Sequence, residues 1–142
     1  MSELHCIHVV AGALCKQEQG KQAQVLIAQR PPGKHLAGGW EFPGGKLHAG
    51  EASLDGLKRE LKEELGIEVQ SAEWLCECTH DYSDRRIHLE LWLIAAFTGV
   101  PSCQEGQALQ WVDINVLDSV DMLPADAPLV KALQVRCHWA ES

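Results

Sequence analysis

Three glutamates stand close together near the middle of the chain: Glu60, Glu63 and Glu64. The sequence around them, from Glu51 to Gly66, has the spacing of an amphipathic helix, and residues three and four apart on a helix are neighbours. Glu60 therefore lies beside both other carboxylates, and the three would repel one another without a cation between them. Carboxylate oxygens are the hard ligands that Mg²⁺ and Mn²⁺ prefer, so the spacing indicates a divalent-metal site.

The same helix must pack on a core, because its opposite face is apolar. Its apolar positions recur at i, i+3 and i+4 and are Leu54, Leu57, Leu61 and Leu65. A simpler interpretation of the acidic face is a solvated surface with salt bridges to Lys58, Arg59 and Lys62. The residue types alone leave both interpretations open.

The length of the chain predicts one domain over residues 1–142, because a chain of this size can bury a core without disulfides. The net charge of −8 argues against direct nucleic-acid binding, which needs basic residues to neutralise phosphates. A small polyphosphate is allowed if metal ions supply positive charge. With no leader-like start and no apolar run of about 20 residues, we expect a cytoplasmic protein with no membrane partner. We expect it to be a monomer or a weak homodimer.

Six cysteines lack the spacing of a metal site, and without a secretory leader we expect free, mostly buried thiols. A zinc site or a disulfide framework is the alternative.

Strands dominate both halves of the chain. Apolar runs predict them over residues 6–15, 25–29, 40–42, 46–48, 67–79, 87–98 and 107–112. Helical spacing predicts a helix over 51–65 and another with Asp126 as N-cap and Pro128 in its first turn. The Pro- and Gly-rich stretch 30–39 is a binding-loop candidate, and 80–86 is a polar turn. This pattern predicts an α+β fold, an α/β/α sandwich with a mixed sheet.

From Gly45, the chain places Glu51 after five residues and Arg59-Glu60-Leu61 after seven more, then Glu63-Glu64 and Gly66-Ile67 after one residue each. This resembles the complete Nudix box, G-x5-E-x7-R-E-U-x-E-E-x-G-U, where U is aliphatic. The runs VLIAQRPPGKHLAGGWEFPGGKLHAGE, DRRIHLELWL, EGQ and PADAPLVKAL are also similar to the MutT-like branch of that family. The resemblance covers most of the chain and implies a Nudix fold, with a mixed β-sheet between helices.

The resemblance also implies a metal-dependent hydrolase of nucleoside triphosphates. Its Mg²⁺ (or Mn²⁺) would be held by Glu60, Glu63, Glu64, a loop glutamate matched by Glu105, and the Gly44 carbonyl. Water would attack the β-phosphorus and give the monophosphate and pyrophosphate, with Glu64 or Glu105 as the general base. Arg59 would orient the glutamates, and Lys46 would contact the phosphates.

Substrate choice depends on residues outside the box. Arg30, His35 and Phe42 match positions near the nucleotide in MutT-like enzymes. Arg85 matches a basic residue that follows the turn Asp there, and we expect all four to bind substrate. Asp126 stands where those enzymes have Asn, and an ionised carboxylate only accepts hydrogen bonds. To recognise 8-oxoguanine in the same way, Asp126 would have to be protonated. Alternatively it accepts from a cytosine N4 amine, or it only caps the helix.

The first hypothesis is therefore a MutT-like pyrophosphohydrolase of oxidised or non-canonical nucleotides such as 8-oxo-dGTP, a role in nucleotide-pool sanitisation and DNA repair. The alternatives are a hydrolase of CTP, 5-methyl-dCTP or another nucleoside diphosphate linked to a group X, and a non-catalytic nucleotide-sensing domain.

Overall fold

The computed structural model describes residues 5–17, 20, 22–34, 36–104 and 106–141. The strands are β1 (His5–Lys16), β2 (Gln24–Gln29), β3 (Trp40–Glu41), β4 (Gly44–Lys46), β5 (Glu68–Asp81), β6 (Arg85–Thr98) and β7 (Leu109–Asp113). The helices are α1 (Ser53–Leu65), the 3₁₀ helix η1 (Ile114–Ser119) and α2 (Ala127–Glu141). Within the described residues, no helix is long and apolar enough to span a membrane.

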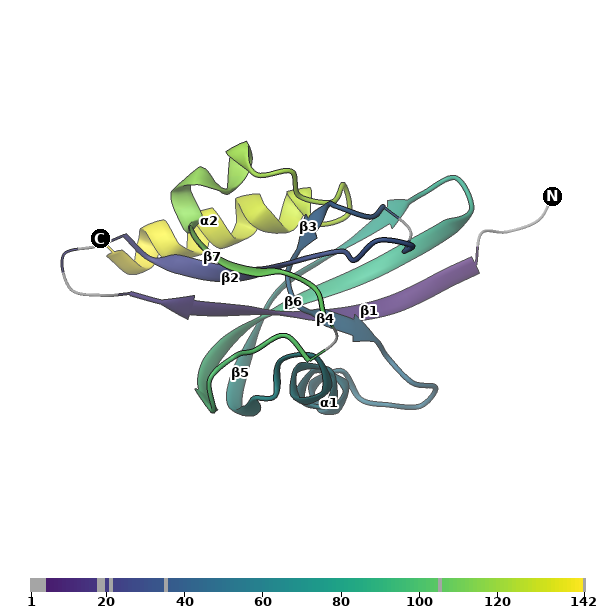
Figure 1. The fold of residues 1–142 in the computed structure, drawn as a ribbon, viewed down its shortest axis with the longest axis horizontal. Helices are drawn as coiled ribbons and strands as arrows, with labels where there is room; N and C mark the ends of the chain where they lie inside the picture. The colour runs from purple at the N-terminus through teal and green to yellow at the C-terminus, as the bar shows by residue number, and fades with distance from the viewer. Residues whose placement is uncertain (1–4, 18–19, 21, 35, 105, 142) are drawn as a thin grey trace.

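The seven strands form one mixed sheet in which β1 is central (Figure 1). β1 pairs in parallel with β6 over ten residue pairs, from His5↔Arg85 to Leu14↔Ile94, and antiparallel with β4 and β2. β5 extends the sheet beyond β6, whereas β3 and β7 both pair with β2. Because every other pairing is antiparallel, the sheet is mixed, as the sequence predicts.

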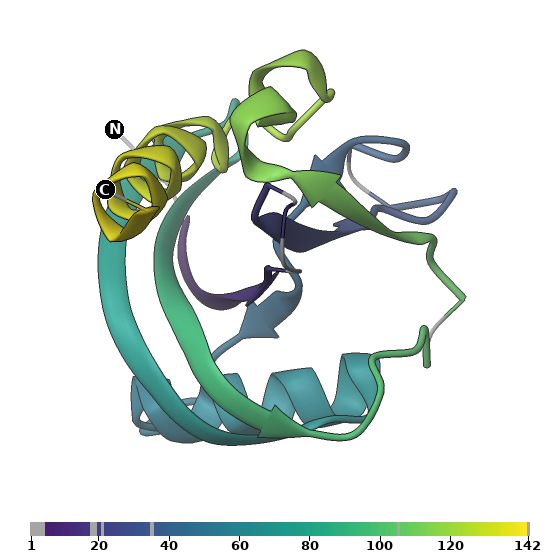
Figure 2. The ribbon, with the colours of Figure 1, turned by 90° about the vertical axis from the view of Figure 1, so that its left-hand side faces the viewer.

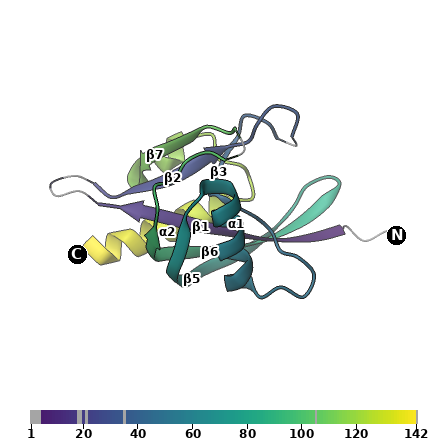
Figure 3. The ribbon, with the colours of Figure 1, turned by 60° about the horizontal axis from the view of Figure 1, so that its bottom comes forward.

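The two long helices lie on opposite sides of this sheet (Figure 2), and α1 crosses the face nearest the viewer in Figure 3. Alternation along the strands supplies both cores: Leu26 packs towards α1, while its neighbours Val25 and Ile27 pack towards α2. On α1, Leu57 and Leu61 are fully buried against the sheet. The predicted α/β/α layering is therefore confirmed.

Several predicted boundaries differ from the structure by one to two residues, and strand partners explain two of the differences. β4 begins at Gly44 rather than Lys46, since Gly44 and Gly45 pair with β1; a Cβ on Gly44 would lie 2.0 Å from the Val10 carbonyl oxygen. The turn between β5 and β6 is shorter than 80–86, because Asp81 and Arg86 pair across the strands, with a 2.7 Å contact between their side chains. All six cysteines are free, but Cys6 is exposed and the other five are half-buried, so the expected burial is only partial.

Candidate active site

The double glycine lets α1 lie close against β4. A Cβ on Gly45 would lie 2.2 Å from Oε2 of Glu60, so any larger residue would displace that carboxylate. The Gly44 N–H donates to Oε2 of Glu64 at 3.0 Å. At its end, α1 stops at Gly66, which has a φ of 72° and donates its N–H to the Lys62 carbonyl.

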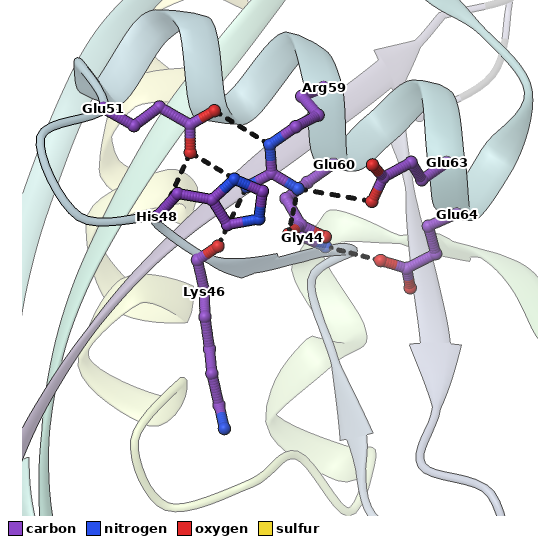
Figure 4. A network of polar contacts seen from close by, with 8 residues as sticks. All are labelled: Gly44, Lys46, His48, Glu51, Arg59, Glu60, Glu63 and Glu64. Atoms are coloured by element: carbon purple, nitrogen blue, oxygen red, sulfur yellow. Dashed lines mark hydrogen bonds and ion pairs between the residues drawn. The ribbon is translucent and has the colours of Figure 1, made fainter.

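Arg59 joins the start of α1 to its acidic face (Figure 4). Its guanidinium holds Glu51 through two bonds, Nε to Oε2 at 2.8 Å and Nη2 to Oε1 at 2.9 Å. Nη1 also donates to Glu60 at 2.8 Å and to Glu63 at 3.2 Å, and Nη2 donates to the Lys46 carbonyl at 3.0 Å. The cation that the structure places between Glu60 and Glu63 is therefore the Arg59 side chain.

This network shifts the pKa values of Glu51 and Arg59. Hydrogen bonds from Arg59, and a further one from the His48 N–H, lower the pKa of Glu51 to about 2. The same bonds to Glu51, followed by those to Glu60, raise the pKa of Arg59. Both groups therefore keep their charges across the neutral range, which fixes the start of α1 to the strand beneath it.

Glu64 is held separately from the other two glutamates. It is only 8% exposed, and its two carboxylate oxygens accept from different groups: Oε2 from the Gly44 N–H and Oε1 from Nε2 of Gln107, each at 3.0 Å. Gln107 is in turn held by Cys103, whose Sγ lies 3.0 Å from its Oε1. Glu64 is thus oriented towards the cleft from two sides.

Two adjoining cavities form a cleft beside these groups. The larger, about 620 Å³, includes Glu64 and Gln107 in its lining, and the smaller, about 130 Å³, includes Asp126 and Phe42. The residues that line both are Arg30, Glu41, Gly44, Lys46 and Arg85. In Figure 4 the Lys46 side chain points away from α1. Three basic side chains and the carboxylate of Glu41 thus stand where the larger cavity, which contains Glu64, meets the smaller one, which contains Asp126.

The smaller cavity contains a buried carboxyl group. Asp126 is 4% exposed, and its Oδ2 accepts from the Phe42 N–H at 3.0 Å. Burial raises the pKa of Asp126 to about 8, and the nearby charge of Glu41 adds to this shift. Burial also raises the pKa of Glu41, although its partner Arg30, 3.4 Å away, acts in the opposite direction. At neutral pH, much of the population therefore holds a proton on Asp126.

Comparison with known proteins assigns a family to this arrangement. Residues 12–132 match the NUDIX domain family. The chain belongs to the NUDIX family. A CTP pyrophosphohydrolase of Escherichia coli K12 is 40% identical to this NUDIX protein over 126 residues, 89% of this chain and 90% of that one. An 8-oxo-dGTP diphosphatase of Haemophilus influenzae is 36% identical, with 91% and 93% covered.

The fold of this NUDIX protein also resembles that of MutT. A structure from a study of MutT from Aliivibrio salmonicida and Vibrio cholerae has a TM-score of 0.76 at 35% identity, covering 92% of this chain and 98% of that one. The expected Nudix fold and MutT-like resemblance are therefore confirmed, and with relatives named as diphosphatases and pyrophosphohydrolases the chain is a NUDIX hydrolase.

The structure gathers most predicted site residues of the NUDIX domain around one cleft. The smaller cavity includes Arg30, Phe42, Gly44, Lys46, Arg85 and Asp126, and the larger includes Glu64. Glu60, Glu63 and Arg59 lie on the adjoining face of α1, outside the lining of these two cavities. His35 and Glu105 lie outside the described residues. The roles given to all these residues stay predictions.

Sequence reasoning missed three residues of this cleft: Glu41, Tyr82 and Gln107. An acidic residue between the aromatics Trp40 and Phe42 is unusual in a short strand, and that signal points to Glu41. Gln107 ends the EGQ run that resembles MutT-like proteins, a signal that could have found it. Nothing local marks Tyr82, because its importance comes from distant segments that the fold brings beside it.

The donor set suits a divalent metal, although its members have other partners in the structure. Glu60, Glu63 and Glu64 offer the hard oxygen ligands that Mg²⁺ prefers. In the part of the chain that the structure describes, no three His, Cys, Asp or Glu side chains are gathered closely enough to hold an ion. Glu60 and Glu63 instead contact Arg59, so holding a metal requires their carboxylates to rotate.

Proposed function

We propose that this NUDIX hydrolase is a Mg²⁺-dependent nucleoside triphosphate pyrophosphohydrolase. It takes oxidised or non-canonical nucleotides such as 8-oxo-dGTP and releases the monophosphate and pyrophosphate. One observation carries the proposal: the same cleft joins the carboxylate of Glu64 to the buried carboxyl of Asp126 through a boundary lined with cations. A nucleotide has the matching parts, a base at one end and a polyphosphate at the other.

Each part of the cleft has a role in this reaction. Glu60, Glu63, Glu64 and Glu105, with the Gly44 carbonyl, would hold the metal, which when bound supplies neutralisation of phosphate charge and activation of a water. Arg59 keeps two of these carboxylates on one side of α1. Lys46 and Arg85, at the boundary of the cavities, balance the remaining charge of the polyphosphate. Glu64 or Glu105 accepts the proton of the attacking water.

Base recognition follows from the protonation of Asp126. A protonated carboxyl donates through its O–H, while Oδ2 accepts from Phe42. It can therefore donate a hydrogen bond to the O6 acceptor of an oxidised guanine. An ionised aspartate cannot do so, because it only accepts hydrogen bonds. Glu41 and Arg30 lie at the same cavity and offer further polar contacts to the base.

A second candidate is hydrolysis of CTP-like pyrimidine nucleotides, favoured by the 40% identity to a CTP pyrophosphohydrolase. The cytosine N4 amine needs an acceptor, which the ionised form of Asp126 supplies. Relative rates on 8-oxo-dGTP, dGTP, CTP and 5-methyl-dCTP separate the two candidates.

The test is pyrophosphate release from this panel with Mg²⁺ by the wild-type chain and by Glu64→Gln. We expect the variant to lose nearly all release at unchanged circular dichroism, because an amide cannot serve as an anionic ligand or base. Glu68→Gln, an exposed glutamate on β5, is the matched control and keeps wild-type rates. Full activity in Glu64→Gln would overturn the mechanism, and no release from any nucleotide by the wild-type chain would overturn the function.

A further inference from the structure

Side chains from the β5–β6 hairpin hold Ala125, the residue directly before Asp126. The Ala125 N–H donates to the Tyr82 hydroxyl at 3.1 Å, and Sγ of Cys78 donates to the Ala125 carbonyl at 3.3 Å. Ala125 is 4% exposed, so water does not readily replace these partners. Both polar groups of one backbone residue are thus held by side chains more than 40 residues away in sequence, with separations of 43 and 47.

The surroundings keep both partners neutral. Burial raises the pKa of Tyr82 and of Cys78, although the hydrogen bond from the Ala125 N–H acts on Tyr82 in the opposite direction. The thiol therefore keeps the proton that it donates, and the phenol stays un-ionised beside the smaller cavity. Their contacts with Ala125 consequently persist across the neutral range.

Tyr82 itself is well placed to act on the cavity. Its ring meets the His80 ring edge-on, with centroids 4.5 Å apart, and it lines the smaller cavity together with Asp126. The ring contributes to the cavity wall, while the hydroxyl holds the backbone that presents the carboxyl. The segment also has an anchor that does not involve Tyr82, because the Leu123 N–H donates to the Trp40 carbonyl at 2.8 Å.

We propose that Tyr82 is a positioning residue for base selection, which holds the Asp126 carboxyl in the base cavity through its hydrogen bond with Ala125. Cys78 supports the same residue from the carbonyl side. This inference rests on the proposed function, because it assigns Asp126 to the base. It places part of the control of specificity on the β5–β6 hairpin, outside the box that performs the hydrolysis.

The test is Tyr82→Phe, which removes the hydroxyl and keeps the ring. We expect the ratio of kcat/KM for the preferred nucleotide over its least favoured base analogue to fall by about threefold to tenfold, the effect of one lost hydrogen bond. KM should change more than kcat, because the metal-binding face of α1 is untouched. Ser83→Ala is the matched control: it removes a hydroxyl from an exposed residue of the same turn and keeps the wild-type ratio.

A double-mutant cycle with Asp126→Ala decides whether Tyr82 acts through Asp126. The effect of Tyr82→Phe on selectivity should disappear in that background, and an equal loss of selectivity in both backgrounds would overturn the proposal.

Hydrogen exchange at the Ala125 amide tests the positioning contact without any substrate. Faster exchange in Tyr82→Phe supports the proposal, and unchanged exchange overturns it. This outcome does not depend on the proposed function, because the measurement needs no hydrolysis of any nucleotide.

Discussion

Asp126 illustrates how the surroundings of one residue change its chemistry. In water its carboxyl would be ionised at neutral pH, but in the fold it is buried beside Glu41 and its pKa rises to about 8. The residue that differs from the asparagine of MutT-like enzymes can therefore still donate a hydrogen bond, as an amide does. Under the proposed function, recognition of the base by Asp126 would therefore depend on pH.

This protonation predicts how stability changes with pH. Between pH 3.8, the ordinary value for Asp, and about 8, the folded chain keeps a proton that the unfolded chain has released. The stabilising contribution is complete below pH 3.8 and is lost as pH rises through 8. In Asp126→Asn this loss disappears, so the variant should gain stability relative to the wild-type chain from pH 5 to 9, measured by urea unfolding.

The same variant should also shift preference towards 8-oxo-dGTP at pH 8 and above, because an amide donates at every pH. Asp118→Asn, which changes an exposed aspartate on η1, is the control and should track the wild-type chain in both measurements. Parallel stability curves for Asp126→Asn and the wild-type chain would contradict the assigned protonation.

For single residues, the sequence predicts which side chains are neighbours only where they belong to one helix or strand. Glu60, Glu63 and Glu64 could be identified because one helix places them together. The Glu41 and Asp126 pair could not, because their mutual effect exists only after the fold has brought β3 to the start of α2.

Among the elements, α1 shows how a helix is fixed in register over the strand beneath it. Its apolar face is buried, and Arg59 links its acidic face to Glu51 and to the Lys46 carbonyl. A guanidinium makes these bonds simultaneously because its donors are arranged in a planar fork. The expected role of Arg59 in orienting the glutamates agrees with this geometry and stays a prediction for the reaction.

Arg59→Lys tests that role. A lysine ammonium cannot replace the fork, so Glu60 and Glu63 lose a shared partner and kcat/KM should fall by about 10- to 100-fold, the range for residues that orient metal ligands. Steady-state kinetics with Mg²⁺ measure this. Arg136, an exposed residue of α2, makes a comparable pair of hydrogen bonds to Glu73 on β5. Arg136→Lys breaks this pair and should change kcat/KM by less than about twofold. Wild-type kinetics in Arg59→Lys would rule out an orienting role.

The elements differ in how well sequence could define them. The end of α1 follows from its own residues, because Gly66 stops the helix, whereas its start lies at Ser53 and not at the predicted Glu51. Those of β4 do not, because a short glycine-rich strand exists only through its pairing with β1. The pairing near Ser71 is irregular and appears as shifts in the β5–β6 register.

At the scale of the whole molecule, layers made of distant segments build one cleft. α1 and α2 cover opposite faces of the sheet, and the cleft lies where residues from β1, β2, β3, β4, β6 and the segment before α2 meet. The spacing of apolar residues predicts these layers, because alternating strands and amphipathic helices must each bury an apolar face. It could not predict the cleft, which depends on strand order.

Metal binding should stabilise the entire fold. The chain has a net charge of −8, and any ion that binds the folded state alone raises its stability, by about 2.7 kcal/mol at a concentration 100 times its Kd. We expect Mg²⁺, added after chelation, to raise the Tm of the wild-type chain and to raise that of Glu64→Gln much less. The exposed control Glu68→Gln should respond as the wild-type chain does. An equal rise in all three proteins would indicate general charge screening and contradict a site that includes Glu64.

The short segment from Phe42 to Gly44 has a consequence for how such enzymes diverge. Pro43 has no N–H, and the two that remain bind the carboxyls of Asp126 and Glu64, each at 3.0 Å. One piece of backbone therefore sets the separation between the carboxyls of Asp126 and Glu64. Under the proposed function, a change at residue 126 would alter the recognised nucleobase while Glu64 keeps its place. Relatives named for an oxidised purine and for a pyrimidine nucleotide, at similar distances from this chain, fit such a history.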